Sequence, residues 1–88
     1  GGKLSYHDLP NGLLPAGQSA EVEVIFAVNT DGRVSQCRPE HSSGYPALDN
    51  LACRLIEQRF RFKPAKDEDG RPVRSWVEES HTWTAREN

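Results

Sequence analysis

The fold of this chain is decided by residues 21–29, which read EVEVIFAVN. Apolar side chains recur at every second position of this stretch, while most positions between them are polar. A period of two residues is typical of a β-strand with one buried and one solvent-facing side. The apolar side consists of Val22, Val24, Phe26 and Val28. We therefore expect a half-buried strand here, around which a small sheet forms.

A hairpin is expected directly after this strand. Residues 29–32 read NTDG, and Gly32 tolerates the positive φ that a tight turn requires. A second strand should then return from Arg33 to about His41. It contains Pro39, which lacks a backbone N–H and is therefore favoured on a strand at the edge of a sheet. One edge of the sheet is thus expected to be blocked against further pairing.

The apolar residues of the second strand are irregularly spaced. Val34 and Cys37 are separated by an odd number of positions, which places them on opposite faces of a regular strand. An extra residue in the strand returns both to the same face, so we expect a β-bulge near residues 35 and 36.

A helix and a third strand are expected next. Pro46 suits the first turn of a helix, where Asp49 complements the helix dipole, and the helix should run to about Arg59. Its apolar face, at helical spacing, comprises Leu48, Leu51, Ala52, Leu55 and Ile56. The pattern then indicates a charged loop over residues 66–72 and a third strand over residues 73–83.

The order strand, strand, helix, strand predicts an α+β fold: a three-stranded antiparallel sheet in the order 2-1-3, with the helix across one face. In this order the third strand lies at the edge opposite Pro39 and keeps a free row of N–H and C=O groups. A free edge is either an aggregation liability, which the charges of Arg74, Glu78 and Glu79 oppose, or a docking site for an extended peptide.

Length and composition describe one small, polar domain. The chain has 88 residues, of which 35% are hydrophobic and 27% charged, and no stretch reads as a membrane span. Its 11 basic and 13 acidic side chains give a formal charge of −2, which is too small to favour nucleic acid or an anionic membrane surface as a partner. A domain this short usually needs a disulfide, a metal or a partner for stability.

The two cysteines are the first candidates for such a stabilising element. Cys37 and Cys53 lack the Cys-x-x-Cys spacing of a zinc site, and His7, His41 and His81 lie far apart in the sequence. We therefore expect no metal and no cofactor. An even cysteine count fits a disulfide in an oxidising compartment, while two buried free thiols in a cytosolic domain are the alternative that the residues leave open.

The sequence contains no evident catalytic motif. Ser42-Ser43-Gly44 and His81 offer a nucleophile and a base by residue type, but the serines lack a Gly-x-Ser-x-Gly elbow and are better explained as the turn that starts the helix. Residues 67–70 are too short for a calcium loop and favour a hairpin tip. We therefore expect a protein that is not an enzyme. A small hydrolase or an inhibitor stays as an alternative.

A series of short motifs, each weak alone, spans about residues 8–83. They are Val-x-Val-x-Phe-x-Val at 22–28, Asp-Gly-Arg-Val at 31–34, Ser-Ser-Gly at 42–44, Leu-Asp at 48–49, Phe-x-Phe-x-Pro-Ala at 60–65 and Gly-Arg-Pro-Val at 70–73. In order and spacing they resemble the C-terminal domain of TonB, the energy transducer of Gram-negative envelopes. Cys37 and Cys53 look like those of a branch of the family in which the second strand and the helix each carry a cysteine, which implies a disulfide between them.

The resemblance implies a periplasmic domain that grips the TonB box of outer-membrane receptors and transmits proton-motive energy for the uptake of siderophores, haem, vitamins or similar nutrients. The box is expected to add as a strand beside the last strand of the domain. A segment before the first strand, residues 6–10, is also expected to touch it, with Leu9 in place of the family's tyrosine. The expected partner-binding residues are Val73, Arg74, Ser75, Trp76, Val77, Glu78, Glu79, Ser80, His81, Tyr6, Leu9 and Pro10.

The domain organisation follows from the same resemblance and from the breaker residues near the start. Residues 1–17, rich in proline and glycine, are expected to form an extended arm, residues 18–84 the TonB-like domain and residues 85–88 a flexible tail. Full-length relatives have an inner-membrane helix that engages ExbB and ExbD, so we expect the anchor and these partners to involve a part upstream of this sequence. A weak homodimer through the open edge is also expected. The alternative is a TolA-like or other periplasmic scaffold or sensor domain with a TonB-like fold.

Overall fold

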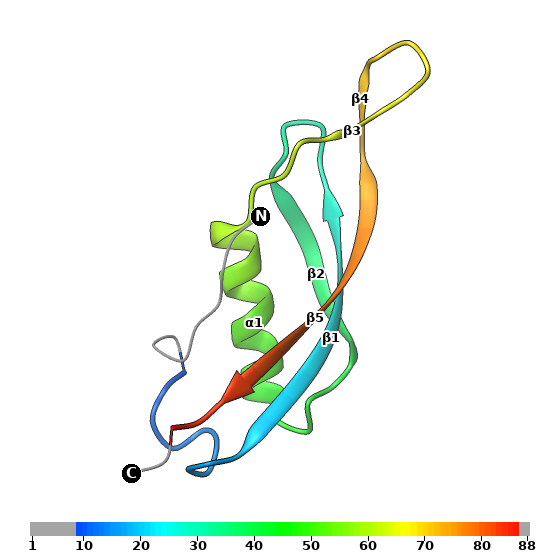
Figure 1. Cartoon of the computed structure of the whole chain (residues 1–88). Helices are drawn as coiled ribbons and strands as arrows, with labels where there is room; N and C mark the ends of the chain where they lie inside the picture. The colour runs from blue at the N-terminus through cyan, green and yellow to red at the C-terminus, as the bar shows by residue number, and fades with distance from the viewer. Residues whose placement is uncertain (1–8, 87–88) are drawn as a thin grey trace.

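The computed structural model describes residues 9–86, which contain one helix and five strands (Figure 1). The elements are β1 (Ser19–Val28), β2 (Val34–His41), α1 (Pro46–Arg59), β3 (Ala65–Lys66), β4 (Pro72–Val73) and β5 (Ser75–Thr84). The three long strands form an antiparallel sheet in the order β2-β1-β5, and α1 lies across one face of it. The predicted α+β fold and its strand order 2-1-3 are confirmed.

The core lies between α1 and the inner face of the sheet. The apolar side of β1 is buried as its alternation predicts, and it packs with the buried face of the helix. The ring of Phe26 is 6.5 Å from that of Phe60 and 5.7 Å from that of Phe62, measured between centroids. Gly32 belongs to this region because a Cβ atom there would lie 2.2 Å from the carbonyl oxygen of Phe62. Only glycine allows the β1–β2 turn to approach this segment so closely.

The two neighbours of β1 pair with it differently. β5 pairs through the full length of both strands, from Ser19 opposite Thr84 to Val28 opposite Ser75, without a shift of register. β2 has two irregularities, and one of them falls between the pairs that join Ile25 and Ala27 of β1 to β2. Residue Gln36 adopts a φ of 55° there. The β-bulge predicted near residues 35 and 36 is therefore confirmed.

A covalent bond joins β2 to the helix. Cys37 and Cys53 form a disulfide, so the alternative with two free thiols is wrong. One helical turn further along α1, the carboxylate of Glu57 accepts a hydrogen bond of 2.9 Å from the backbone N–H of Cys37. Next to the bulge, the N–H of Cys37 thus bonds to a helix side chain instead of to β1. The helix therefore holds β2 at two adjacent points, through the disulfide and through this hydrogen bond.

A buried carboxylate fixes the turn between β2 and α1. Asp49 is 3% exposed and accepts hydrogen bonds from the hydroxyls of Ser42 and Ser43 and from the backbone N–H of Ser43. Burial acts to raise the pKa of Asp49, but the hydrogen bonds from the two serines outweigh it and hold the pKa below its ordinary value. The Ser-Ser-Gly motif therefore starts the helix, as expected.

The segment between α1 and β5 corrects one sequence-based prediction. The third long strand begins at Ser75, not at residue 73, and the expected loop over residues 66–72 is closed by the short antiparallel pair β3 and β4. The tip between them is organised by Asp67, whose carboxylate accepts 2.9 Å hydrogen bonds from the N–H groups of Asp69 and Arg71. The expected loop is thus a small hairpin. Its strands have two residues each, which is too short to give a periodic pattern in the sequence.

The segment before β1 is bent by turns in its described part. The N–H groups of Leu13 and Gln18 each donate to a carbonyl three residues earlier, and Leu14 is buried in the core. Ala85, just after β5, donates its N–H to the carbonyl of Gln18 at 2.9 Å. Residues 17 and 18 are therefore hydrogen-bonded beside the end of β5. The domain boundaries at residues 17 and 84 stay predictions.

Candidate docking edge

β5 is the outer strand of the sheet on the side away from β2. In an antiparallel pair, alternate residues of an edge strand direct N–H and C=O groups away from their partner. Within residues 9–86 no strand pairs with this outer side of β5. The strand is ten residues long and has an uninterrupted register with β1. It therefore presents a long, regular row of backbone donors and acceptors.

The side chains of β5 alternate between two environments. The side chains toward the helix are half-buried or buried: Ser75, Val77, Glu79, His81 and Trp83. The side chains on the opposite, outer face are exposed: Trp76, Glu78, Ser80, Thr82 and Thr84. A strand that pairs with β5 thus meets apolar and titratable groups on one face and mostly polar groups on the other.

Trp76 is the large apolar side chain of the outer face. It is 47% exposed, and its ring lies opposite Ala27 of β1, which is fully buried. The guanidinium carbon of Arg74 is 5.0 Å from the ring centroid and that of Arg38, on β2, is 6.0 Å away. Arg74 also donates its Nε–H to the side-chain oxygen of Asn29 at 3.1 Å. Two arginines from different parts of the chain are therefore held against one indole ring.

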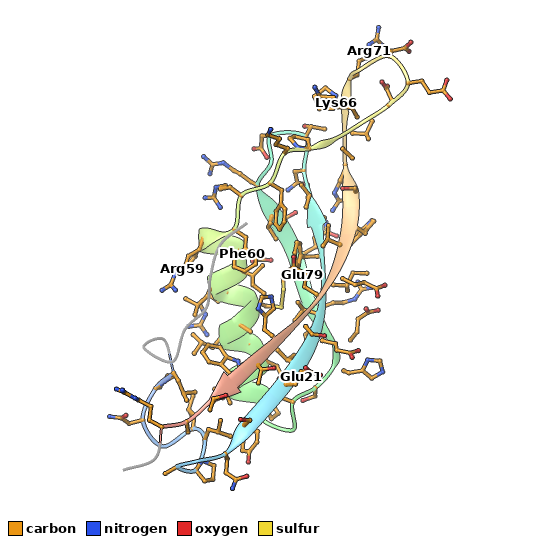
Figure 2. All side chains as sticks on the ribbon, in the orientation of Figure 1. Glu21, Arg59, Phe60, Lys66, Arg71 and Glu79 are labelled. Atoms are coloured by element: carbon orange, nitrogen blue, oxygen red, sulfur yellow. A yellow bond between two sulfur atoms is a disulfide. The ribbon has the colours of Figure 1, made fainter. Side chains whose placement is uncertain are left out.

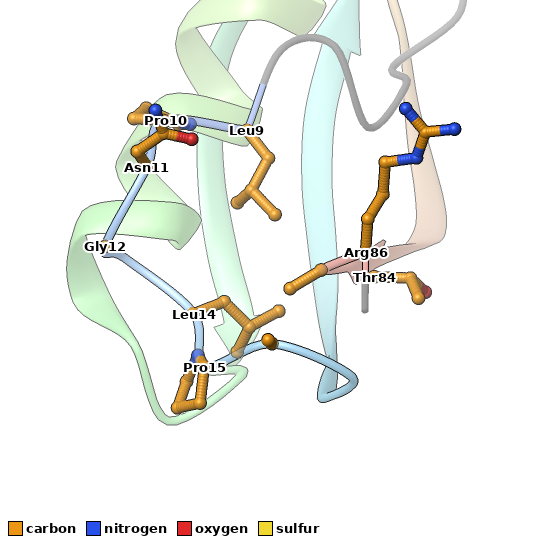
Figure 3. A pocket seen from close by; sticks show the side chains of 10 residues that line it. Leu9, Pro10, Asn11, Gly12, Leu14, Pro15, Thr84 and Arg86 are labelled. Atoms are coloured by element: carbon orange, nitrogen blue, oxygen red, sulfur yellow. The ribbon is translucent and has the colours of Figure 1, made fainter. Parts of the chain in front are cut away.

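A hollow separates the segment before β1 from the end of β5 (Figure 3). It has a volume of about 680 Å³. One side is formed by Leu9, Pro10 and Leu14, and the other by Thr84 and Arg86. The last part of the open edge thus leads into a recess with apolar side chains along one wall.

The sequence of residues 8–84 matches the family described as Gram-negative bacterial TonB protein C-terminal. The chain belongs to the TonB C-terminal domain family. It is a TonB-type periplasmic domain, and the family is one of energy-transducer domains rather than of enzymes. A search of curated proteins found no match to the chain.

The partner-binding residues predicted for this TonB C-terminal domain fall into three places. Seven of them, residues 75–81, lie on β5, whereas Val73 belongs to β4 and Arg74 lies between the two strands. Leu9 and Pro10 line the hollow at the far end of β5. Tyr6 lies outside the described residues. Two sets of predicted residues thus lie near each other: residues 75–81 on β5, and Leu9 and Pro10 at the hollow where β5 ends.

Sequence reasoning missed the other residues of that hollow in the TonB domain. Leu14 lies in a segment dominated by proline and glycine, and Thr84 and Arg86 fall at the end of the family motifs. The adjacent Leu13 and Leu14 were the available signal, because an apolar pair in a segment of turns usually has a surface to cover. Its position beside β5 depends on contacts between the two ends of the chain, which no local pattern reveals.

The residues considered for catalysis do not meet in this domain. Ser42 and Ser43 bind Asp49 at the start of α1, whereas the ring of His81 is 5.6 Å from that of Phe60, just after the last turn. A helix of 14 residues is about 20 Å long, so the serines and the histidine are at opposite ends of it. His81 instead lies 3.2 Å from a carboxylate oxygen of Glu79 on the same strand.

No group of three or more histidine, cysteine, aspartate or glutamate side chains is arranged to hold a metal ion among residues 9–86. In the same part of the chain, no helix has the length and apolar character needed to cross a bilayer.

Proposed function

We propose that this domain binds the TonB box of outer-membrane receptors by strand addition at the open edge of β5. The observation that carries the proposal is the uninterrupted, ten-residue outer strand whose free side is not paired within residues 9–86. Main-chain hydrogen bonds supply affinity in such a complex without demanding a fixed partner sequence. The hollow bounded by Leu9 and Pro10 at the end of β5 supports contact between the N-terminal segment and the same bound strand.

The domain then serves as the periplasmic end of an energy transducer. Through a part upstream of this sequence it is anchored in the inner membrane and engages ExbB and ExbD, and the receptor it grips imports a siderophore, haem, a vitamin or a similar nutrient. Backbone pairing along the whole of β5 distributes a pulling force over several hydrogen bonds at once. Without a receptor strand, the same edge allows weak pairing of two copies through β5.

Hydrogen exchange of the backbone amides tests strand addition directly. In the free domain, amides of β5 that point toward β1 are protected, while those that point outward exchange rapidly. A synthetic peptide with the TonB box of a receptor should protect the outward amides of residues 75–84 and leave the protection of the others unchanged. Protection confined to α1 or β2 would refute docking at β5 and favour a scaffold role.

A backbone-modified peptide is the matched control. N-methylation of alternate residues keeps every side chain but removes the N–H donors along one edge of the peptide. Methylation of the residues that pair with β5 should weaken binding at least tenfold, and methylation of the residues between them should have little effect. Equal affinity for both peptides would show that binding does not use the backbone edge.

A further inference from the structure

The charge on the outer face of the sheet changes sign along β5. Near the start of the strand, Arg38 and Arg74 flank the ring of Trp76. Further along, Glu78 lies on the same face, beside a shallow depression lined in part by Glu23 and Glu40. Figure 2 shows Lys66 and Arg71 at the hairpin, which also carries Asp67, Glu68 and Asp69, and Glu21 toward the other end of the molecule.

The charges nearest to the open edge are not neutralised within the domain. Arg74 and Glu78 form no ion pair with any described residue, and neither does Arg38 on the more distant β2, whereas Glu23 and Glu79 each lie against a histidine. The Arg74 side chain is held by the Trp76 ring and by Asn29, contacts that leave most of its N–H groups free. A guanidinium already fixed in place loses less conformational entropy when it meets a carboxylate.

The spacing of these charges matches the repeat of an extended peptide. Residues two apart on a strand lie on one face and are about 7 Å apart, so Trp76 and Glu78 share a row on β5. Arg74, just before the strand, lies against the Trp76 ring at the start of this row. A strand that pairs with β5 has a row of its own on the same face, directly beside this one. Opposite charges in such neighbouring positions favour the pair, and like charges disfavour it.

We propose that the β5 edge selects a segment with a specific charge order: an aspartate or glutamate beside Arg74 and Trp76, and a lysine or arginine beside Glu78. This inference rests on the proposed strand addition and specifies which receptor segments the edge prefers. Arg74 and Glu78 thus fix the register of the bound strand, because a shift by four residues along β5 brings the acidic side chain of the segment beside Glu78.

The test uses three synthetic peptides of the same receptor box. One carries an acidic residue and a basic residue four positions apart, the second has the two interchanged, and the third has glutamine at both positions. We expect one of the charged peptides to bind about fivefold more tightly than the other at low salt, as for exposed ion pairs, with the difference reduced in 0.5 M salt. Equal affinities at both salt concentrations would overturn the charge selectivity.

A charge-interchanged domain makes the test specific to this row. In the double variant Arg74→Glu/Glu78→Arg the preference between the two charged peptides should reverse. The matched control Glu68→Arg/Arg71→Glu, at the exposed hairpin tip, has the same net charge and should keep the original preference. A preference that stays unchanged in the first variant, or that reverses in the control, would contradict the assignment.

The glutamine peptide separates this inference from the proposed function. If it still protects the outward amides of β5 while the charged peptides bind equally, strand addition holds and the charge selectivity fails. If none of the three peptides protects β5, both proposals fail.

Discussion

The two edges of the sheet differ in almost every property that governs pairing with another chain. β2 is interrupted by a bulge with Gln36 at positive φ, contains Pro39, and is tied to α1 by the disulfide. β5 has no proline, no register shift and no covalent tie within the described residues. Both strands belong to one sheet and pair with the same central strand. The contrast shows that a small domain can direct association to one side by making the other side unsuitable.

The first way to break this contrast is to remove the disulfide. The double variant Cys37→Ala/Cys53→Ala opens a loop with a sequence separation of 16, and loop-closure entropy predicts a loss of about 3 kcal/mol in the free energy of unfolding. Urea denaturation measures the loss. Peptide binding at β5 should change less than twofold under conditions where the variant is folded, because the bond holds the opposite edge.

Single-molecule pulling with and without reductant tests the mechanical part of the same prediction. The force needed to separate β2 from α1 should fall when the disulfide is reduced. Equal unfolding forces, or a loss of peptide binding in the folded double variant, would show that the two edges do not act independently.

The second prediction concerns the turn that leads from β2 into α1. Asp49→Asn removes a buried charge from a network with Ser42 and Ser43 and should cost about 1 to 3 kcal/mol at neutral pH. Because the folded-state pKa of Asp49 is lowered, its ionised form contributes stability above the unfolded pKa of about 3.9. This contribution is lost as the pH falls through the folded pKa.

Thermal unfolding at a series of pH values between 7 and about 2.5 measures this contribution. The difference in stability between the unmodified domain and Asp49→Asn should be constant near neutral pH and should narrow below about pH 4. Asn50→Asp, at an exposed neighbouring position, is a control for an added carboxylate without the serine network. A difference that does not depend on pH would contradict the role given to the Asp49 charge.

The smallest effect on stability is expected at Pro39. Pro39→Thr restores a backbone N–H on an exposed residue of β2 and should change the free energy of unfolding by less than about 0.5 kcal/mol. Its effect should appear in association instead, as weak dimerisation through β2 in sedimentation experiments at high concentration. If the variant pairs no more than the unmodified domain, the bulge and the disulfide alone are enough to block this edge.

Local patterns predicted most of the fold because each main element carries its own signal. The alternation of residues 21–29 identified the central strand, and the spacing of Val34 and Cys37 revealed the bulge. Pro46 marked the start of the helix, which ends at Arg59 as expected. In each case the signal comes either from residues close together in the sequence or from the spacing of apolar residues that burial imposes on one element.

The candidate site was less predictable because it depends on register and on contacts between the chain ends. The position of Arg38 against the Trp76 ring requires that β2 and β5 pair with opposite sides of β1, with Arg38 opposite Ile25 and Trp76 opposite Ala27. The break at Arg74 follows from the β3–β4 hairpin, whose strands have two residues each. Such features appear only when the strands are assembled.

The length of β5 relative to the whole domain has a mechanical consequence. A ten-residue strand measures about 33 Å, whereas the domain extends over 54 × 21 × 14 Å. The strand therefore does not fit across either shorter dimension, and Figure 1 shows it running lengthwise. An elongated body pulled from one end turns until its long axis points along the pull. A segment paired with β5 is then loaded in shear, with all its hydrogen bonds strained together, rather than peeled away one bond at a time.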